Sequence, residues 1–332
     1  MIAIALLFCA STVDAHDRDY VSDFVDFRRQ YSKSYDTIEE FEERMNIFMK
    51  NMEFIDRMND DETVTFKLSV NQYADISPEE FHSTYKGFRF EDSKLLGKTR
   101  SCKAYDDYVN GTDSDLPSSF DWRDEGKVTE VKNQGQCGSC WSFSSAGAME
   151  GSWAIKTGQL VNLSEQQLID CSKTYGDLGC NGGLMDNAFE YAIDNGMCLY
   201  SDAPYEAVTG SCDDISCTAV ADFDYCVDVT PDNQQHLKEA VHSYPVSIAI
   251  EADTRTFQFY SSGIITSDAC GTSLDHGVLI VGYGEEDGTE YWTVKNSWGS
   301  DWGEDGYVRI ARSDSTNDPG VCGIAMQPSF IV

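Results

Sequence analysis

The feature that most constrains the fold is a stretch near the middle of the chain where a polar, Gly-punctuated loop runs directly into an apolar helix. Residues 133–139 read Asn-Gln-Gly-Gln-Cys-Gly-Ser, and Cys140 follows them. Apolar residues then recur every three to four positions, which predicts an amphipathic helix that begins at Cys140 and ends near Gly158. The loop therefore delivers Cys140 to the first turn of a helix.

A cysteine at this position has two interpretations. Most cysteines in a chain that holds twelve are halves of disulfides, and Cys137 and Cys140 also form the C-x-x-C spacing of thiol–disulfide oxidoreductases. Against a redox role, no βαβ pattern surrounds the pair, and Cys180 offers Cys137 a structural partner. The free N–H groups and positive dipole of a helix start instead stabilise a thiolate and lower the thiol pKa. We therefore predict that Cys140 is a nucleophile.

A thiol nucleophile needs a base that takes its proton and a group that holds the base. After residue 116 the chain holds three histidines, of which His236 and His242 fall in a short helical stretch typical of a surface. His276 alone precedes a strand-like apolar run, and Asn296 lies further on, beside Trp298. The chain thus supplies a candidate base, His276, and a candidate residue to hold it, Asn296, after Cys140.

The stretch Cys137-Gly138-Ser139-Cys140-Trp141, with a distant His and Asn, resembles the signature of the papain family of cysteine proteases, and the chain is most similar to the cathepsin L type. The resemblance covers nearly the whole chain. It includes a propeptide pattern, E-x3-R-x3-F-x2-N-x3-I-x3-N, at Glu40, Arg44, Phe48, Asn51, Ile55 and Asn59. Residues 69–75 resemble the family's G-x-N-x-F-x-D element, with Ser69 and Tyr73 replacing Gly and Phe. Ser69 is a departure if that position requires a positive φ.

The resemblance implies an α+β fold in which two lobes of a peptidase, one helical and one a β-barrel-like sheet, flank a cleft behind a helical inhibitory prodomain. The pattern of the residues agrees, because helical periodicity to about residue 195 gives way to strand-like runs at 246–250, 278–283, 291–294 and 307–310. Ser164 and Gln167 form a capping box at one helix start. We expect a signal peptide at 1–15, an inhibitory propeptide at 16–115 with a cleavable linker over about 87–115, and the peptidase at 116–332.

The net charge and the N-terminal sequence indicate in which compartment the protein works. The net charge of −33 argues against nucleic acid and anionic membranes as partners, and it suggests work at acid pH, where carboxylates protonate and self-repulsion falls. Residues 1–10 are apolar and are followed by small residues suited to signal cleavage. No apolar run reaches the roughly twenty residues of a membrane span. We expect the secretory pathway, ending in a lysosome- or vacuole-like acidic compartment or outside the cell.

Roles for the catalytic residues follow from the resemblance. Cys140 is expected to attack the peptide carbonyl as a thiolate that forms an ion pair with His276, which later protonates the leaving amine. Asn296 is expected to orient the imidazole, and Trp298 to shield their hydrogen bond from water. Gln134 matches the family's side-chain donor to the oxyanion, alongside the backbone N–H of Cys140.

The substrate site is likewise implied. Gly182 and Gly183 match a wall that an extended peptide approaches closely, and Asp275 also lies at the substrate. The pocket for the residue just N-terminal to the cleaved one is expected to be apolar, so that it favours bulky hydrophobic side chains. Its expected residues are Leu184, Met185, Ala249 and, at the floor, Gln327.

The family also implies three disulfides, Cys137–Cys180, Cys171–Cys212 and Cys270–Cys322, while the pairing of Cys198, Cys217, Cys226 and Cys102 stays open. Asn110 and Asn162 begin glycosylation sequons. The expected protein is a monomeric endopeptidase that needs no cofactor or metal. Its partners would be protein substrates, its own propeptide and cystatin-type inhibitors. The alternatives are a catalytically silent binding or inhibitor protein of the same fold and the oxidoreductase considered above.

Overall fold

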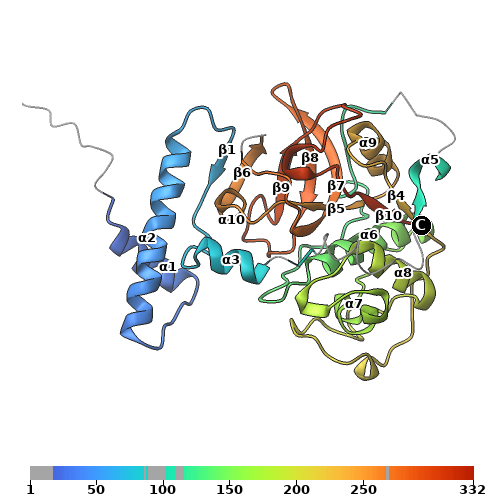
Figure 1. The fold of residues 1–332 in the computed structure, drawn as a ribbon, viewed down its shortest axis with the longest axis horizontal. Helices are drawn as coiled ribbons and strands as arrows, with labels where there is room; N and C mark the ends of the chain where they lie inside the picture. The colour runs from blue at the N-terminus through green and yellow to red at the C-terminus, as the bar shows by residue number, and fades with distance from the viewer. Residues whose placement is uncertain (1–17, 86, 89–101, 109–115, 267–268) are drawn as a thin grey trace, which may run out of the picture.

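The computed structural model describes residues 18–85, 87–88, 102–108, 116–266 and 269–332. It has three parts: an N-terminal helical unit, a sheet-rich lobe in the middle and a helical lobe beside it (Figure 1). The predicted α+β architecture, helical first and sheet-rich later, is therefore confirmed. The signal peptide at 1–15, the Asn110 sequon, most of the linker and the expected cleavage point before Leu116 lie outside the described residues.

The N-terminal unit is a pair of helices built around aromatic rings. Helix α1 (Tyr20–Gln30) buries Phe24 and Phe27 against Phe48 of α2 (Ile38–Asp60), with ring centroids 5.3 and 5.0 Å apart. Strand β1 (Phe66–Leu68) and helix α3 (Pro78–Tyr85) complete it. The helical periodicity of the sequence arises because one face of each helix must be apolar to form this core.

The polar members of the propeptide pattern tie α2 to the chain that follows it. The buried Asn51 side-chain amide donates to the carbonyls of Ala74 (2.9 Å) and Ile76 (3.1 Å). The Asn59 side chain both donates to and accepts from the backbone of Leu68, at 2.8 and 2.9 Å. These asparagines therefore satisfy backbone groups that no helix or sheet partner reaches.

The helical lobe contains α6 (Cys140–Thr157), α7 (Glu165–Cys171) and α8 (Met185–Asn195), with 3-10 turns at Ser172–Tyr175, Gly179–Asn181 and Cys212–Asp214. Helix α6 begins at Cys140 and ends at Gly158, whose φ of 77° closes it, as predicted. Ser164 caps α7 by accepting from the Gln167 backbone N–H. The capping box is only half formed, because the Gln167 side-chain oxygen accepts from Cys198 N instead.

The sheet lobe is built on one continuous sheet of ten strands in the order β1-β6-β9-β8-β7-β5-β10-β4-β2, with β3 joined to β7. The pairs β6–β9 and β2–β4 are parallel and the others antiparallel. The strands are β2 (Lys103–Ala104), β3 (Phe120–Asp121), β4 (Cys226–Asp228), β5 (Val246–Ile250), β6 (Tyr260–Ile265), β7 (His276–Glu286), β8 (Thr289–Lys295), β9 (Tyr307–Ala311) and β10 (Ser329–Ile331). Helices α5 (Tyr105–Tyr108), α9 (Gln234–Ser243) and α10 (Arg255–Phe259) and a 3-10 turn at Val321–Gly323 accompany them. The four strand runs expected from the sequence are β5, β7, β8 and β9.

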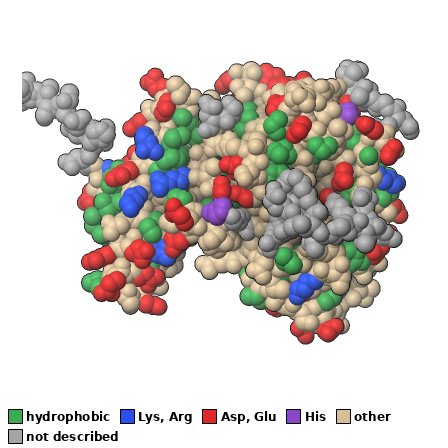
Figure 2. Space-filling model, in the orientation of Figure 1, with side chains coloured by type: hydrophobic (Ala, Val, Ile, Leu, Met, Phe, Trp, Pro, Cys, Tyr) green, Lys and Arg blue, Asp and Glu red, His purple; other side chains and the backbone are tan. Residues whose placement is uncertain are grey.

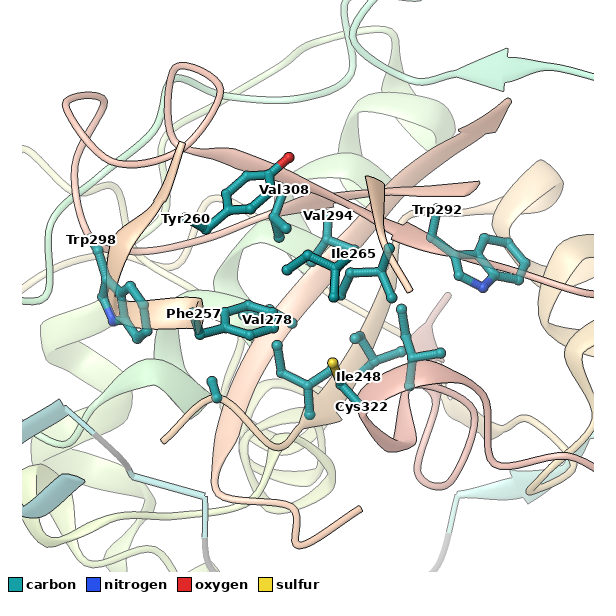
Figure 3. Packing of buried hydrophobic residues seen from close by; sticks show 14 of the residues in the cluster. Ile248, Phe257, Tyr260, Ile265, Val278, Trp292, Val294, Trp298, Val308 and Cys322 are labelled. Carbon is teal, nitrogen blue, oxygen red and sulfur yellow. The ribbon is translucent and has the colours of Figure 1, made fainter. Parts of the chain in front are cut away.

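Two apolar clusters divide the molecule. One fills the sheet lobe and continues into the N-terminal unit, and the other fills the helical lobe. In the first, Phe257, Tyr260 and Val308 gather near Trp298, while Trp292 lies at the other side of the cluster (Figure 3). The N-terminal unit therefore shares a core with the sheet lobe rather than resting on its surface.

The N-terminal unit docks by extending the sheet. Strand β1 pairs antiparallel with β6, where Phe66 lies opposite Gly263. Gly263 has a φ of 91°, and a Cβ there would lie 2.6 Å from the Thr65 carbonyl oxygen, so only glycine allows this approach. Ser69 donates its N–H to Phe259 O at 2.8 Å and does not have a positive φ, so its replacement of Gly causes no backbone strain.

Acidic side chains dominate the surface. Asp and Glu are spread over the whole visible face, whereas Lys and Arg are few and gather mainly over α1 and α2 (Figure 2). Within the described residues, no helix is long and apolar enough to cross a membrane.

Replacing Asn51 with alanine should loosen the N-terminal unit. The buried Ala74 carbonyl would lose the side-chain bond from Asn51, at a cost of about 2 kcal/mol, while the Ile76 carbonyl would keep its bond from Gln258 Nε2. We expect faster hydrogen exchange of the α2 backbone amides in Asn51→Ala, measured by mass spectrometry on the whole chain. Glu53→Ala, at an exposed position of the same helix, is the control and should exchange like the parent. Equal exchange in both variants would contradict this role for Asn51.

Candidate active site

Cys140 is the first residue of α6 and is fully buried. Among the described residues, Cys140 is the cysteine that forms no disulfide. Its neighbour Cys137 is bonded to Cys180. That disulfide removes the C-x-x-C pair on which an oxidoreductase would depend. The Cys140 sulfur accepts the N–H of Gly277 at 3.3 Å. The start of α6 in the helical lobe thus lies against the start of β7 in the sheet lobe.

His276 and Asn296 meet at that same point. His276 begins β7 and Asn296 follows β8, and the His276 Nε2 lies 2.8 Å from the Asn296 Oδ1. Both side chains are buried, and the imidazole lies against the Trp298 indole with centroids 4.7 Å apart. The other imidazole nitrogen, Nδ1, makes no hydrogen bond with any described residue. It is therefore the nitrogen free to exchange a proton.

Gln134 is held with its amide N–H groups facing the start of α6. Its Oε1 accepts the Ser297 hydroxyl at 2.7 Å, which fixes which end of the amide donates. The Nε2 donates to Cys137 O at 2.9 Å and to Tyr85 O at 3.4 Å. A carbonyl from the end of α3 therefore contacts the side-chain donor that the sequence analysis assigned to the oxyanion.

Burial acts against the charged forms of both Cys140 and His276 in this form of the molecule. Burial raises the pKa of Cys140 to about 12, although backbone N–H groups, that of Gly277 first, act to lower it. Burial also lowers the pKa of His276 to about 4, against the opposite effect of its bond to Asn296. Burial thus disfavours the expected thiolate–imidazolium pair in this form, because removing water from the two charges costs more than the N–H groups at the helix start contribute to stabilising the thiolate.

The chain beyond α3 runs through the groove between the lobes. Gly87 and Phe88 both donate their N–H groups to Asp275 O, at 3.2 and 3.1 Å, while Gly183 N donates to Gly87 O at 2.9 Å. A Cβ on Gly87 would lie 2.1 Å from Gly138 O, so the chain passes too close to the Cys140 loop for any side chain. Phe88 forms a parallel bridge with Gly183. This segment therefore occupies the expected substrate wall.

Three of the residues expected at the hydrophobic pocket lie in one apolar cluster. Leu184, Met185 and Ala249 are buried in the same cluster as Phe88. The groove lining includes Met326, whereas Gln327 is not among its described lining residues. Leu184, Met185 and Ala249 are not among those lining residues either, so this lining is not that of the expected pocket.

One buried carboxyl supports the substrate wall and was not predicted. Asp177 is fully buried, and its Oδ1 accepts from Leu184 N at 2.9 Å and from the Asn187 amide at 3.2 Å. Its Oδ2 accepts the Ser172 hydroxyl at 2.7 Å. Burial raises the pKa of Asp177 to about 7 despite these three donors. No sequence pattern identifies it, since its role depends on contacts across a loop. Ser297 could have been noticed, because it stands between Asn296 and Trp298.

The described residues offer little for a metal or cofactor. His82, Asp253 and Asp275 bring ligand atoms within 4.8 Å of one another. His82 Nδ1 and Asp253 Oδ2 already lie 2.6 Å apart, within hydrogen-bond distance, so they join α3 to the sheet lobe.

Five disulfides are formed. Cys137–Cys180, Cys171–Cys212 and Cys270–Cys322 pair as the family resemblance implied. The cysteines left open pair as Cys198–Cys217 and Cys102–Cys226. Asn162, the described sequon, is half-buried, and its side-chain oxygen is inaccessible.

Comparison with known proteins agrees with this geometry. Residues 116–332 match the papain family of cysteine proteases, and residues 24–81 match the cathepsin propeptide inhibitor domain. The chain is 46% identical over 301 residues to cysteine proteinase RD21A of Arabidopsis thaliana, with 90% of this chain but only 63% of the relative covered. It is 41% identical to thiol protease SEN102 of Hemerocallis, with 99% and 92% covered.

Solved proforms have the same fold. The proform of the Amb a 11 cysteine protease, a ragweed pollen allergen, superposes with a TM-score of 0.85 at 39% identity, covering 94% of each chain. Digestive procathepsin L 3 of Tenebrio molitor gives a TM-score of 0.82 at 40% identity, covering 95% of this chain and 99% of that one.

Asp177 should make stability depend on pH. Its folded pKa is raised from 3.8 to about 7, so the folded protein keeps a proton that the unfolded chain loses, and stability falls as pH rises through this window. Asp177→Asn should remove that fall, which is at most about 4 kcal/mol. Denaturant midpoints from pH 4 to 8, in a Cys140→Ala background, test this. The exposed Asp213→Asn is the control, and parallel pH profiles for both variants would refute the assignment.

Proposed function

The chain belongs to the papain family of cysteine proteases, and on that premise we propose that it is an endopeptidase that cleaves peptide bonds with Cys140 as nucleophile. One observation carries the proposal: the free thiol at the start of α6 accepts the N–H of Gly277, and Asn296 holds the imidazole of the preceding residue, His276, by its far nitrogen. The chain also carries the family's propeptide inhibitor domain, so it is made as a self-inhibited zymogen.

In the proposed mechanism, His276 Nδ1 takes the proton from the Cys140 sulfur as the sulfur bonds to the substrate carbonyl carbon. His276 then protonates the leaving amine, which leaves a thioester on Cys140. Water deprotonated by the imidazole attacks that thioester and releases the acid. Asn296 keeps the ring in one orientation throughout, because its Oδ1 accepts the Nε2 proton.

The oxyanion formed at each step is proposed to bind Gln134 Nε2 and the backbone N–H of Cys140. Two contacts support this assignment. The Ser297 hydroxyl fixes the Gln134 amide in the donating orientation, and the Tyr85 carbonyl oxygen already contacts the Nε2 in the zymogen. Donors fixed before the reaction stabilise developing charge without reorganisation.

Inhibition is proposed to combine occupancy with reversed polarity. Residues 87–88 fill the groove and bridge Gly183 in the parallel sense. A substrate that pairs antiparallel with the same wall would run the other way, so the inhibitory segment presents its peptide bonds in the wrong orientation to Cys140.

Acid is the proposed trigger for release. Lys33 pairs with Asp75 at 2.9 Å, and Arg44 pairs with Glu80 at 2.8 Å, within the N-terminal unit. Burial acts to raise the pKa of Glu80, but the bond and charge of Arg44 together with the hydrogen bonds from Ser77 leave that pKa lowered. The stabilisation is therefore present above pH about 4.5 and is lost as pH falls, which loosens the unit in an acidic compartment.

We propose the processing scheme and setting that the sequence suggested: removal of residues 1–15 as a signal peptide, an inhibitory region to about residue 115 and a peptidase from about Leu116. Five disulfides support an oxidising compartment of the secretory pathway. A lysosome- or vacuole-like compartment or the extracellular space fits the acid trigger. Protein substrates and cystatin-type inhibitors are the proposed partners of a monomer, and the acidic surface disfavours nucleic acid and anionic membranes.

Loss of Gln134 should slow the chemical step. We expect Gln134→Ala in the processed enzyme to lower kcat by about 10²-fold with little change in KM, because the lost donor acts on the transition state. Gln136→Ala, exposed in the same loop, is the matched control and should retain parental kinetics. Cys140→Ala should abolish cleavage. Steady-state assays on one peptide suffice, and a Cys140→Ala enzyme that still cleaves would overturn the mechanism.

The apolar pocket should select bulky hydrophobic residues at the second position before the cleaved bond. Peptides with Leu or Phe there should exceed those with Arg in kcat/KM by roughly 10²-fold, because a charge would be buried unpaired. Met326→Glu should narrow this gap by about tenfold, since it adds a carboxylate to the groove lining. Gln327→Glu should leave it unchanged. A narrowed gap in Gln327→Glu with an unchanged gap in Met326→Glu would instead place Gln327 at the pocket floor.

A further inference from the structure

Residues 102–108 precede the expected start of the peptidase, yet they are built into its sheet. Cys102 is bonded to Cys226, the first residue of β4. Strand β2 pairs in parallel with β4, with Lys103 opposite Val227. This is the far end of the sheet from β1, where the inhibitory unit docks, and α5 lies there beside β4 and α9 (Figure 1). The segment is therefore separate from the inhibitory contacts.

Two tyrosines anchor the segment in the sheet-lobe core. Tyr105 is 2% exposed, its ring lies 4.9 Å from that of His236, and its hydroxyl donates to Glu239 at 3.3 Å. The Tyr108 ring packs edge-on against Phe330 of β10, with centroids 5.3 Å apart. Buried aromatic rings of this kind contribute strongly to packing. The segment is thus anchored by one buried and one half-buried ring, while Lys103, Ala104, Asp106 and Asp107 face solvent.

The part of the chain that inhibits is held differently. Residues 18–88 contain no cysteine, so only noncovalent contacts join them to the rest of the molecule. Cleavage within 89–101 would free them, whereas Cys102 stays bonded to Cys226 whatever peptide bonds are cut. Hydrolysis of each peptide bond consumes one water and leaves the disulfide unchanged.

We propose that residues 102–108 remain in the processed enzyme as a covalently bound part of the sheet lobe. When the chain is also cut near Leu116, the product is a two-chain enzyme whose short chain is joined through Cys102–Cys226. The segment protects the edge of β4, whose backbone would otherwise be open to pairing with another chain. Of the region that precedes Leu116, the part that leaves on activation therefore ends before Cys102.

The test is a mass map of the processed protein. The purified proprotein is incubated at pH 4, and a Cys140→Ala sample is treated with added pepsin, so the result does not depend on the protein's own activity. The intact mass of the non-reduced product should account for residues 102–108. Where the chain has been cut within 109–115, reduction should release these residues as a separate peptide. A non-reduced product that lacks residues 102–108 would overturn the proposal.

A double variant, Cys102→Ser with Cys226→Ser, separates the covalent bond from the packing. After both cuts it should lose the short chain on gel filtration and show a melting temperature roughly 5–10 °C below that of the processed parent, because two aromatic anchors leave the core. Retention of the short chain at the parental level would show that the disulfide is not what holds it. The parent's mass map stands as the test if the variant does not fold.

Discussion

The indole of Trp298 is the contact on which both the active site and its inhibition depend. On one side it lies against His276, whose bond to Asn296 it covers, and it is itself only 1% exposed. On the other side it meets Phe81, with centroids 5.1 Å apart, and Tyr73 at 6.1 Å. A hydrogen bond kept from water is stronger and better oriented. The inhibitory unit therefore docks on the same ring that organises the imidazole.

That arrangement makes inhibition electrostatic as well as steric. Tyr85 O contacts Gln134, Gly87 crosses the Cys140 loop, and burial beneath them raises the pKa of Cys140 and lowers that of His276. A neutral thiol is a poor nucleophile. When water returns to the groove, the desolvation penalty falls, and the helix start and the imidazole can stabilise the thiolate.

Much of the catalytic half was predictable because its signals are local. The periodicity after Cys140 gave the bounds of α6, and four apolar runs became β5, β7, β8 and β9. The docking of β1 on β6 and of β2 on β4 could not be predicted, since two- and three-residue edge strands carry no period and their partners lie more than a hundred residues away. Asp177 was missed for a different reason, because its three donors meet it only through the shape of a loop that has no sequence period. The pKa of Cys140 in the proform could not be predicted, because a helix start reports one influence on that pKa and not the burial that raises it.

The Cys102–Cys226 bond also changes its physical meaning when the chain is cut. In the uncut chain it closes a loop across a separation of 124 residues, and it restricts the unfolded chain by an entropy worth about 5 kcal/mol in the simple polymer picture. A break within 109–115 opens that ring, so the same two sulfurs join a short peptide to a long one and restrict far less. The denatured precursor is therefore less disordered than the denatured two-chain enzyme. Maturation thus gives up part of the stability that this disulfide contributes to the uncut chain.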